Sequence, residues 1–404
     1  MPPTSPRPSS PDPTTTSPDP TTTSPDPTTT SPDPTTTSPG PDTGDIGIEG
    51  YDAVEHWVGN ARQAAHYYRS VFGFRLVGYA GPETGVRDRA SYVLEQGSIR
   101  FVVSGALSSD HPIAEHQRRH GDGIRDVAFR VDSAERAFTT ALDRGAMPQH
   151  EPTVLEDEHG KLVVAAIAVY GDTIHSFVQR QDYNGVYAPG YEPVADDPMS
   201  SDVGLARIDH AVANVPEGEM DAWSRYYQSV LGFSQLRHFD DEAISTEDTA
   251  LMSKVLTDDR GRIKLPINEP APGEKRSQIE EYLQAYEGPG IQHLALETDD
   301  IVRTVSGLRR RGVGFLPVPD EYYADARQRV GAVDESWADL QQLGVLVDRD
   351  DEGYLLQIFT EPVQDRPTVF FEIIQRQGSQ GFGVGNFRAL FEAIERAQRR
   401  RGNL

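Results

Sequence analysis

The octapeptide Tyr67-Tyr-Arg-Ser-Val-Phe-Gly-Phe74 returns in the second half of the chain as Tyr226-Tyr-Gln-Ser-Val-Leu-Gly-Phe233, with six of the eight positions identical. Such a repeat indicates that one structural unit has been duplicated. In the second copy, apolar residues from Trp223 to Leu231 recur at helical spacing, and Gly232 suits the end of a helix. Each copy is therefore predicted to form an amphipathic helix whose aromatic side chains belong to the core.

A second pair of matching segments extends the repeat to four modules. Gly123-Ile-Arg-Asp-Val-Ala-Phe-Arg-Val-Asp132 corresponds to Gly290-Ile-Gln-His-Leu-Ala-Leu-Glu-Thr-Asp299. Each segment is predicted to be a strand followed by a helix that stops at a glycine. Modules of one strand, one helix and several further strands then begin near residues 48, 122, 206 and 289. The predicted fold class is therefore α+β, with two modules in each of two domains.

Composition sets the predicted domain boundaries. Residues 1–45 contain Ser-Pro-Asp-Pro-Thr-Thr-Thr four times in succession, without an apolar residue in the repeat, so this tail is predicted to be disordered. A dispensable extension is favoured over a tether or a phosphorylated segment. The first folded domain is predicted over residues 46–185, a linker over 186–204, and the second folded domain over 205–404.

The charge balance narrows the class of partner. The 38 Lys and Arg residues against 63 Asp and Glu residues give a formal net charge of −25, which disfavours nucleic acid and anionic membranes. Cysteine is absent, which excludes disulfides, thiolate metal sites and cysteine nucleophiles. Neither a membrane-spanning run nor a signal-peptide core is found, so a cytoplasmic protein is expected.

A buried carboxylate is predicted near the C-terminus. Val369-Phe-Phe-Glu-Ile-Ile-Gln-Arg376 is short, apolar and rich in β-branched and aromatic residues, which favours a strand covered on both faces. Glu372 would then lie in the core, where a carboxylate needs a paired charge or a metal ion.

Alignment of the two halves supplies two histidines as partners for this carboxylate. The aligned positions are His210 with Ala53, His293 with Asp126, and Glu372 with Ser176. Two histidines and one carboxylate leave three positions of an octahedral ion open, as in non-haem Fe(II) oxygenases. The alternative of three satisfied core residues needs a separate explanation for each polar side chain. A metal site is therefore predicted in the second half only.

The other histidines are assigned no role. His111, His116 and His120 lie in a polar segment that is predicted to be an exposed connection, so no metal site is expected there, although two of them have i, i+4 spacing. The remaining ones, which have no aligned partners, are His56, His66, His150, His159, His175 and His238.

Longer motifs in the second half resemble a known family. They are Lys264-Leu-Pro-Ile-Asn-Glu-Pro270, Gly290-Ile-Gln-His293, Arg366-Pro-Thr-Val-Phe-Phe-Glu-Ile-Ile-Gln-Arg376 and Gly381-Phe-Gly-Val-Gly-Asn-Phe387. With these motifs the chain resembles the 4-hydroxyphenylpyruvate dioxygenases from about Gly47 to Leu404. The resemblance implies the vicinal oxygen chelate fold, in which paired βαβββ modules form open β-barrels, and it implies Fe(II) held by His210, His293 and Glu372.

The resemblance also implies a substrate pocket. Catalytic polar groups are expected at Gln292, Asn268 and Ser253. Substrate contacts are expected at Gln278, Gln357, Phe359, Phe382, Asn386 and Phe387. A few neutral polar groups in an apolar cavity suit the orientation of a small ligand. For Gln278 and Gln357, the alternative is that they only cap backbone groups.

By this resemblance, the expected activity is conversion of 4-hydroxyphenylpyruvate and O2 to homogentisate and CO2 in tyrosine and phenylalanine catabolism. One alternative is 4-hydroxymandelate synthase, which uses the same scaffold, substrate and iron; another is a non-catalytic small-molecule-binding protein. Pro266-Ile-Asn-Glu-Pro270 and Leu356-Gln-Ile-Phe359 favour the homogentisate-forming branch. Relatives imply a homodimer or homotetramer. The segment Asn386–Arg400 is expected to be a helix that covers the active-site mouth.

Overall fold

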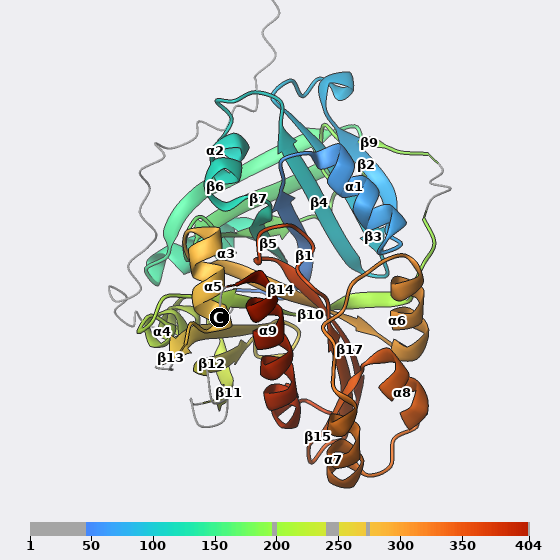
Figure 1. The fold of residues 1–404 in the computed structure, drawn as a ribbon. Helices are drawn as coiled ribbons and strands as arrows, with labels where there is room; N and C mark the ends of the chain where they lie inside the picture. The colour runs from blue at the N-terminus through green and yellow to red at the C-terminus, as the bar shows by residue number, and fades with distance from the viewer. Residues whose placement is uncertain (1–45, 196–199, 240–249, 272–274, 403–404) are drawn as a thin grey trace, which may run out of the picture. The chain divides into compact units, whose positions relative to one another are not determined.

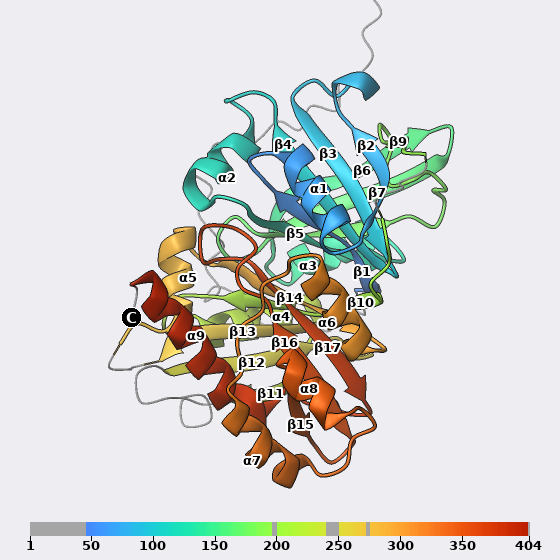
Figure 2. The same cartoon turned by 45° about the vertical axis from the view of Figure 1, so that its right-hand side comes forward.

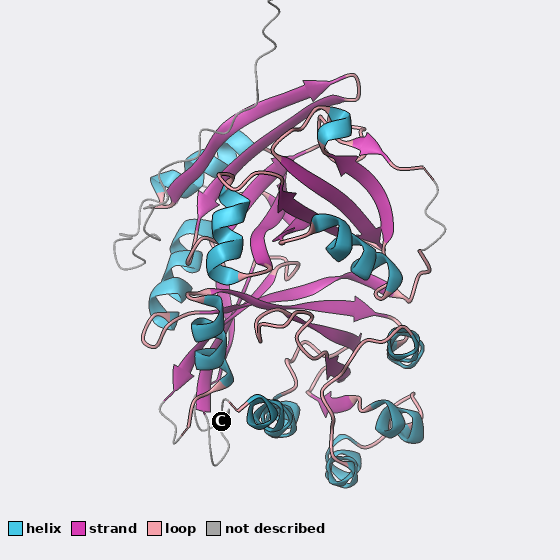
Figure 3. Ribbon diagram, turned by 45° about the horizontal axis from the view of Figure 1, so that its top comes forward, coloured by secondary structure: helices cyan, strands magenta, loops and turns pink. Residues whose placement is uncertain are grey.

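The structure is a computed structural model that describes residues 46–195, 200–239, 250–271 and 275–402. The tail over residues 1–45, for which disorder is predicted, lies outside the described residues. Figure 1 shows two groups of strands, one in each half of the chain, and Figure 3 shows each group as a curled layer with helices packed along it. Among the described residues, no helix combines the length and apolar character needed to cross a membrane.

The first half contains two βαβββ modules. The first consists of β1 (Ile48–Trp57), α1 (Ala61–Ser70), β2 (Arg75–Ala80), β3 (Arg89–Gln96) and β4 (Ile99–Ala106). The second consists of β5 (Gly123–Val131), α3 (Ala134–Asp143), β6 (Met147–Asp157), β7 (Gly160–Ala168) and β8 (Ile174–Gln179). The 3-10 turn η2 (Pro82–Thr84) connects β2 to β3, and helix α2 (Pro112–His120) and strand β9 (Glu192–Pro193) lie outside the modules. The sheet order is β6-β7-β8-β5-β1-β4-β3-β2-β9, so the modules meet at β5 and β1.

The second half repeats this plan with additions. Its third module consists of β10 (Leu205–Asn214), α4 (Met220–Leu231), β11 (Ser234–Phe239), β12 (Ala250–Thr257) and β13 (Lys264–Ala271). Its fourth consists of β14 (Gly290–Thr298), α6 (Ile301–Arg310), β15 (Leu346–Arg349), β16 (Tyr354–Phe359) and β17 (Phe370–Gln377). The added elements are α5 (Gln278–Tyr286), α7 (Asp320–Val330), α8 (Trp337–Leu343), η3 (Val384–Asn386) and α9 (Phe387–Arg401). The sheet order is β11-β12-β13-β10-β14-β17-β16-β15.

The duplicated octapeptide forms the helices that the repeat predicts. Helix α4 buries Trp223, Tyr226 and Tyr227, which are each at most 1% exposed. Gly232 ends the helix with φ of 72°, a left-handed conformation that glycine adopts without steric cost. The predicted α+β class and the paired βαβββ modules are confirmed, and all four modules begin within one residue of the predicted positions.

The two halves share contacts in one hydrophobic cluster. The hydroxyl of Tyr227 lies 2.7 Å from Nε2 of His175, and the ring of Phe371 lies 5.0 Å from that of Phe72. Strand β9, which belongs to the segment 186–204, pairs with β2 of the first sheet. The boundaries 46–185, 186–204 and 205–404 stay a prediction.

One expectation was wrong: the segment that contains His116 and His120 is not an exposed connection. Both histidines lie on helix α2 and are only 3% exposed. The helix packs against β1, β4 and α5, and the ring of His120 stacks on Tyr286 at 4.3 Å. A polar segment is buried here because its partner is an aromatic residue far away in the sequence.

Candidate active site

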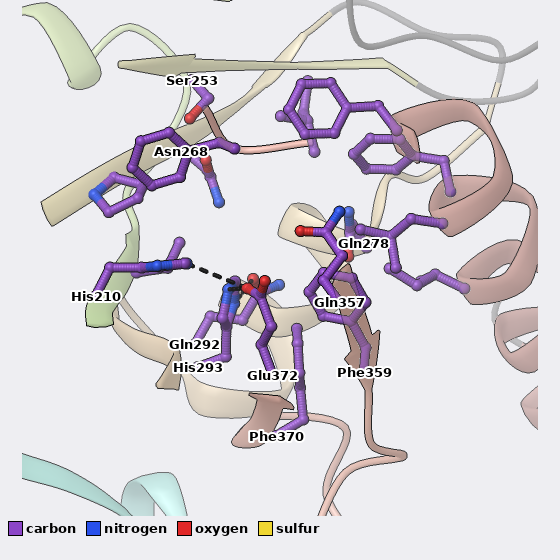
Figure 4. Close-up of a pocket in the computed structure, with 18 of the residues that line it drawn as sticks. His210, Ser253, Asn268, Gln278, Gln292, His293, Gln357, Phe359, Phe370 and Glu372 are labelled. Atoms are coloured by element: carbon purple, nitrogen blue, oxygen red, sulfur yellow. Dashed lines mark hydrogen bonds and ion pairs between the residues drawn. The ribbon is translucent and has the colours of Figure 1, made fainter. Parts of the chain in front are cut away.

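The second sheet surrounds a pocket (Figure 4). Side chains reach it from strands β10, β12, β13, β14, β16 and β17 and from helices α5 and α9. The sequence-predicted residues that line it are His210, Ser253, Asn268, Gln278, Gln292, His293, Gln357, Phe359, Glu372, Phe382 and Phe387. Residues from six strands and two helices thus converge on one cavity.

Strand register brings the three candidate metal ligands together. Strand β14 pairs with β10 on one side and β17 on the other, and both His210 and Glu372 stand opposite Ala295. His293 lies two residues before Ala295 on β14, so its side chain points to the same face of the sheet. Nε2 of His210 is 3.2 Å, and Nε2 of His293 is 3.7 Å, from Oε2 of Glu372.

The trio fits a divalent metal ion. All three residues are buried and their donor atoms lie within 4.8 Å of one another. Oε1 of Glu372 is buried without a hydrogen-bond partner among the described residues, as expected for a carboxylate that coordinates a cation. Nδ1 of His210 is 2.7 Å from Oδ1 of Asp209, which in turn accepts hydrogen bonds from Arg376. This outer carboxylate orients the imidazole so that Nε2 faces the site.

The same burial and charges set the protonation of the ligands. Burial alone raises the pKa of Glu372, but the two neighbouring histidines outweigh it and lower the pKa to about 2. Burial lowers the pKa of His293, and the attraction of Glu372 does not compensate. Glu372 is therefore an anion and His293 a neutral imidazole, which are the forms that bind metal. Burial lowers the pKa of His210, but the carboxylates of Glu372 and Asp209 outweigh burial and raise it, so a metal ion would have to displace a proton from this ring.

The positions of the first half that align with the three candidate ligands do not repeat this trio. At the aligned positions, Ala53 carries no donor atom, and the carboxylate of Asp126 accepts hydrogen bonds from the backbone N and the hydroxyl of Ser176. The hydrogen bonds of Asp126 therefore lie within its own sheet, and the aligned positions offer no counterpart of the candidate trio.

The amide side chains of the pocket differ in how firmly they are held. Oε1 of Gln292 lies 3.1 Å from Nδ1 of His293, and Asn268 donates to Oδ1 of Asn214 at 3.3 Å. Nε2 of Gln357 is buried without a partner among the described residues. At the start of α5, Ser277 supplies the N-cap, so Gln278 is not needed as a cap. Gln278 is thus the first residue of the helix and not its N-cap.

Aromatic rings form the walls of the pocket. Phe359 and Phe382 face the histidines, with the ring of Phe382 5.2 Å from that of His210. Phe370, which sequence reasoning missed, stacks on His293 at 4.6 Å. The sequence could have indicated Phe370 as a pocket residue. It lies two residues before Glu372, so its side chain points to the same face of strand β17.

Asn386 does not line the pocket. Its side chain is fully buried, and Oδ1 accepts hydrogen bonds from the hydroxyl of Tyr322 at 2.6 Å and from Arg329 at 3.4 Å. The turn η3 directs this side chain toward α7 and β15. The structure thus gives Asn386 a role in holding the turn before α9, in place of the expected substrate contact.

Comparison with known proteins identifies the family. The family model described as "Hydroxyphenylpyruvate dioxygenase, HPPD, N-terminal" matches residues 43–192, and the Glyoxalase/Bleomycin resistance protein/Dioxygenase superfamily matches residues 207–358. A 4-hydroxyphenylpyruvate dioxygenase of Yarrowia lipolytica is 47% identical over 368 residues, which are 88% of this chain and 93% of the relative. The chain belongs to the 4-hydroxyphenylpyruvate dioxygenase family. A member from Dictyostelium discoideum is also 47% identical, over 88% of this chain and 100% of its own.

A solved structure shares the fold of this 4-hydroxyphenylpyruvate dioxygenase family member. A triple mutant of 4-hydroxymandelate synthase from Streptomyces coelicolor has a TM-score of 0.77 and 31% identity, over 87% of this chain and 99% of its own. The vicinal oxygen chelate fold expected from the sequence is confirmed. The synthase is a structural neighbour, whereas the more similar curated relatives carry the dioxygenase name.

Proposed function

We propose that this protein converts 4-hydroxyphenylpyruvate and O2 to homogentisate and CO2, in the breakdown of tyrosine and phenylalanine. The observation that carries the proposal is the convergence of His210, His293 and Glu372 on one end of an aromatic pocket. Family membership agrees with this reading.

The proposed cofactor is Fe(II), held by Nε2 of His210, Nε2 of His293 and the carboxylate of Glu372. Two imidazoles and one carboxylate on one face leave open positions for substrate and O2, the arrangement of non-haem Fe(II) oxygenases. When bound, Fe(II) supplies coordination of the 2-oxo acid and activation of O2. Asp209, through its contact with the imidazole of His210, would hold that ligand in place.

The charge of the pocket supports a substrate with one anionic group that binds at the metal. The described residues that line the cavity include neither Lys nor Arg, and Glu372 is the only carboxylate among them. A divalent cation with one carboxylate ligand leaves one positive charge, which matches one substrate carboxylate. The opposite end of the pocket is neutral and suits an aromatic ring.

The other side chains that line the pocket would orient the ring. Phe359, Phe382 and Phe387 provide apolar contact, while Ser253, Asn268, Gln278 and Gln357 offer neutral donors and acceptors. Such groups can form hydrogen bonds with a phenol hydroxyl and add no net charge to the pocket. Gln292, which touches a metal ligand, would act nearest to the reacting side chain.

Helix α9 would exclude water from this chemistry. Phe387, Leu390, Phe391 and Ile394 project from it into the pocket, and Figures 1 and 2 show the helix beside α5. Its last residue, Arg401, forms an ion pair with Glu281 of α5 at 2.6 Å. We expect a lid that seals the cavity when substrate is bound.

The test is O2 uptake by anaerobically Fe(II)-loaded protein given 4-hydroxyphenylpyruvate, with the aromatic product identified by chromatography. Homogentisate formed in equal amount to the O2 consumed is the expected result. Hydroxymandelate would move the protein to the synthase branch, which its structural neighbour represents. Bound iron without O2 uptake would favour the non-catalytic binding alternative.

Three further expectations stay predictions. They are the cytoplasmic location, the homodimeric or homotetrameric assembly, and the domain boundaries given above. Sedimentation of the purified protein and limited proteolysis would test the second and third.

A further inference from the structure

A second cluster of metal-ligating side chains lies in the first half. His116 and His120 are one helical turn apart on α2, so both project from the same face of the helix. Asp172, in the turn between β7 and β8, meets them there. Among the described residues, this is the second of two such groups, and the proposed function does not use it.

The donor spacing in this cluster is like that of the active-site trio. Oδ2 of Asp172 is 2.8 Å from Nδ1 of His116 and 3.4 Å from Nε2 of His120. The corresponding distances from Glu372 to His210 and His293 are 3.2 and 3.7 Å. Ligands at about 2.0–2.1 Å from a tetrahedral zinc ion lie about 3.3 Å apart, so small shifts would admit an ion.

The hydrogen bonds of His120 leave a coordinating atom free. Nδ1 of His120 is bonded to the backbone carbonyl of Tyr286, which only accepts, so Nδ1 carries the hydrogen. In the neutral ring, Nε2 then holds a lone pair, and it faces the carboxylate of Asp172 without a hydrogen bond. Two electron-rich atoms at this distance repel each other unless a metal ion or a second ring proton lies between them. A carbonyl that orients a histidine in this way is a common outer partner of metal ligands.

The cluster is enclosed but still reachable. The side chains of His116 and His120 are 1% and 4% exposed, whereas that of Asp172 is 31% exposed. A metal ion can therefore enter past the carboxylate, and a water molecule can occupy a fourth position on that side. Cysteine is absent from the chain, so an imidazole and carboxylate site is the type of zinc site open to it.

We propose that His116, His120 and Asp172 bind a divalent transition-metal ion of the zinc class. The ion would be structural: it ties α2 to the turn between β7 and β8 and, through His120 and Tyr286, to the end of α5. Strand β14, which carries Gln292 and His293, begins four residues after Tyr286. The site therefore braces the segment that leads into the active site, without contact with substrate.

Equilibrium dialysis against Co(II), used as the probe, tests the proposal. Wild-type protein should bind two ions per chain. The variants Asp172→Asn and His116→Gln should bind one, with affinity at the second site lowered by more than about 100-fold, because even outer partners of metal ligands are worth about 10- to 100-fold. His66→Gln, which changes an exposed histidine of α1, is the matched control and should bind two. One ion in wild type and one in Asp172→Asn would overturn the proposal.

The two sites can be separated by their spectra. Glu372→Ala should lose the active-site ion and keep the second, with the strong visible absorption of four-coordinate Co(II). If Glu372→Ala retains no ion, the second site does not exist. Failure of the proposed catalysis would leave this result unchanged, since the readout is bound metal.

A measurement on the wild-type protein tests the site even if the variants do not fold. Zn(II) added to metal-free protein should slow amide hydrogen exchange in α2 and in residues 169–173, at least tenfold. If the amide hydrogen-exchange rate in α2 is the same with and without Zn(II), the metal site is refuted. The three side chains then form an ordinary hydrogen-bonded cluster.

Discussion

His210 and Glu372 both stand opposite Ala295, on the two strands that flank β14, and their nearest side-chain atoms are 3.2 Å apart. The small side chain between them lets two residues that are far apart in the sequence come within ion-pair distance of each other. A larger residue there would push the ligands apart, because directly opposed side chains on one face of a sheet are neighbours.

The first prediction concerns this position. Ala295→Val should lower Fe(II) affinity by at least tenfold and cost about 1–3 kcal/mol of stability through overpacking. Ala211→Val is the matched control, because Ala211 is equally buried on β10 but pairs with Leu294 on the other face. The control should lose similar stability and keep its iron. Equal iron content in the two variants, measured by atomic absorption, would refute the steric argument.

The second prediction separates metal ligands from a pocket residue. His210→Ala, His293→Ala and Glu372→Ala should each abolish turnover and hold less than about a tenth of the wild-type iron, because three protein ligands are the whole donor set. Gln292→Ala should keep its iron and lose substrate affinity or product fidelity. Wild-type iron occupancy in all three ligand variants would show that the site lies elsewhere.

The third prediction concerns the ion pair that joins the end of α9 to α5. Arg401→Gln removes the ion pair with Glu281, which is worth about 1 kcal/mol, so the open lid should become about fivefold more populated. We expect less homogentisate per O2 consumed. Arg400→Gln changes an exposed ion pair with Glu361 and should have no such effect.

Truncation after Gly385 is the stronger form of the same experiment. A truncated protein that stays folded and still forms product in equal amount to the O2 consumed would disprove the lid.

The fourth prediction concerns the first half. Burial raises the pKa of Asp126 to about 7, and the nearby Glu55 carboxylate adds to the rise. The unfolded carboxyl has a pKa of about 3.9, so the folded protein keeps a proton that the unfolded chain has lost between these values. Stability therefore falls as the pH rises from about 4 to about 7, and is constant above that.

Asp126→Asn removes this loss, because the amide does not ionise. The variant should be more stable than wild type at pH 8 by up to about 4 kcal/mol, from three pKa units of about 1.4 kcal/mol each, and nearly equal to it at pH 4. Urea unfolding at both pH values measures the difference. A stability difference that does not change with pH would contradict a raised pKa for this group.

The sequence by itself determined the modular architecture and the choice of candidate metal ligands. A repeated octapeptide with helical spacing fixes a helix locally, and Gly232 ends it as the spacing predicts. The aligned halves singled out His210, His293 and Glu372, because a polar residue on an apolar strand is visible in the sequence itself.

Only the tertiary structure decided which of the remaining side chains meet. Asn386 turned away toward Tyr322, Phe370 joined the pocket, and His120 became buried against Tyr286. Each of these outcomes depends on how a strand, turn or helix packs against a segment that is distant in the chain. Periodicity reports the face that a residue occupies on its own element, whereas strand register and helix packing determine what lies opposite that face.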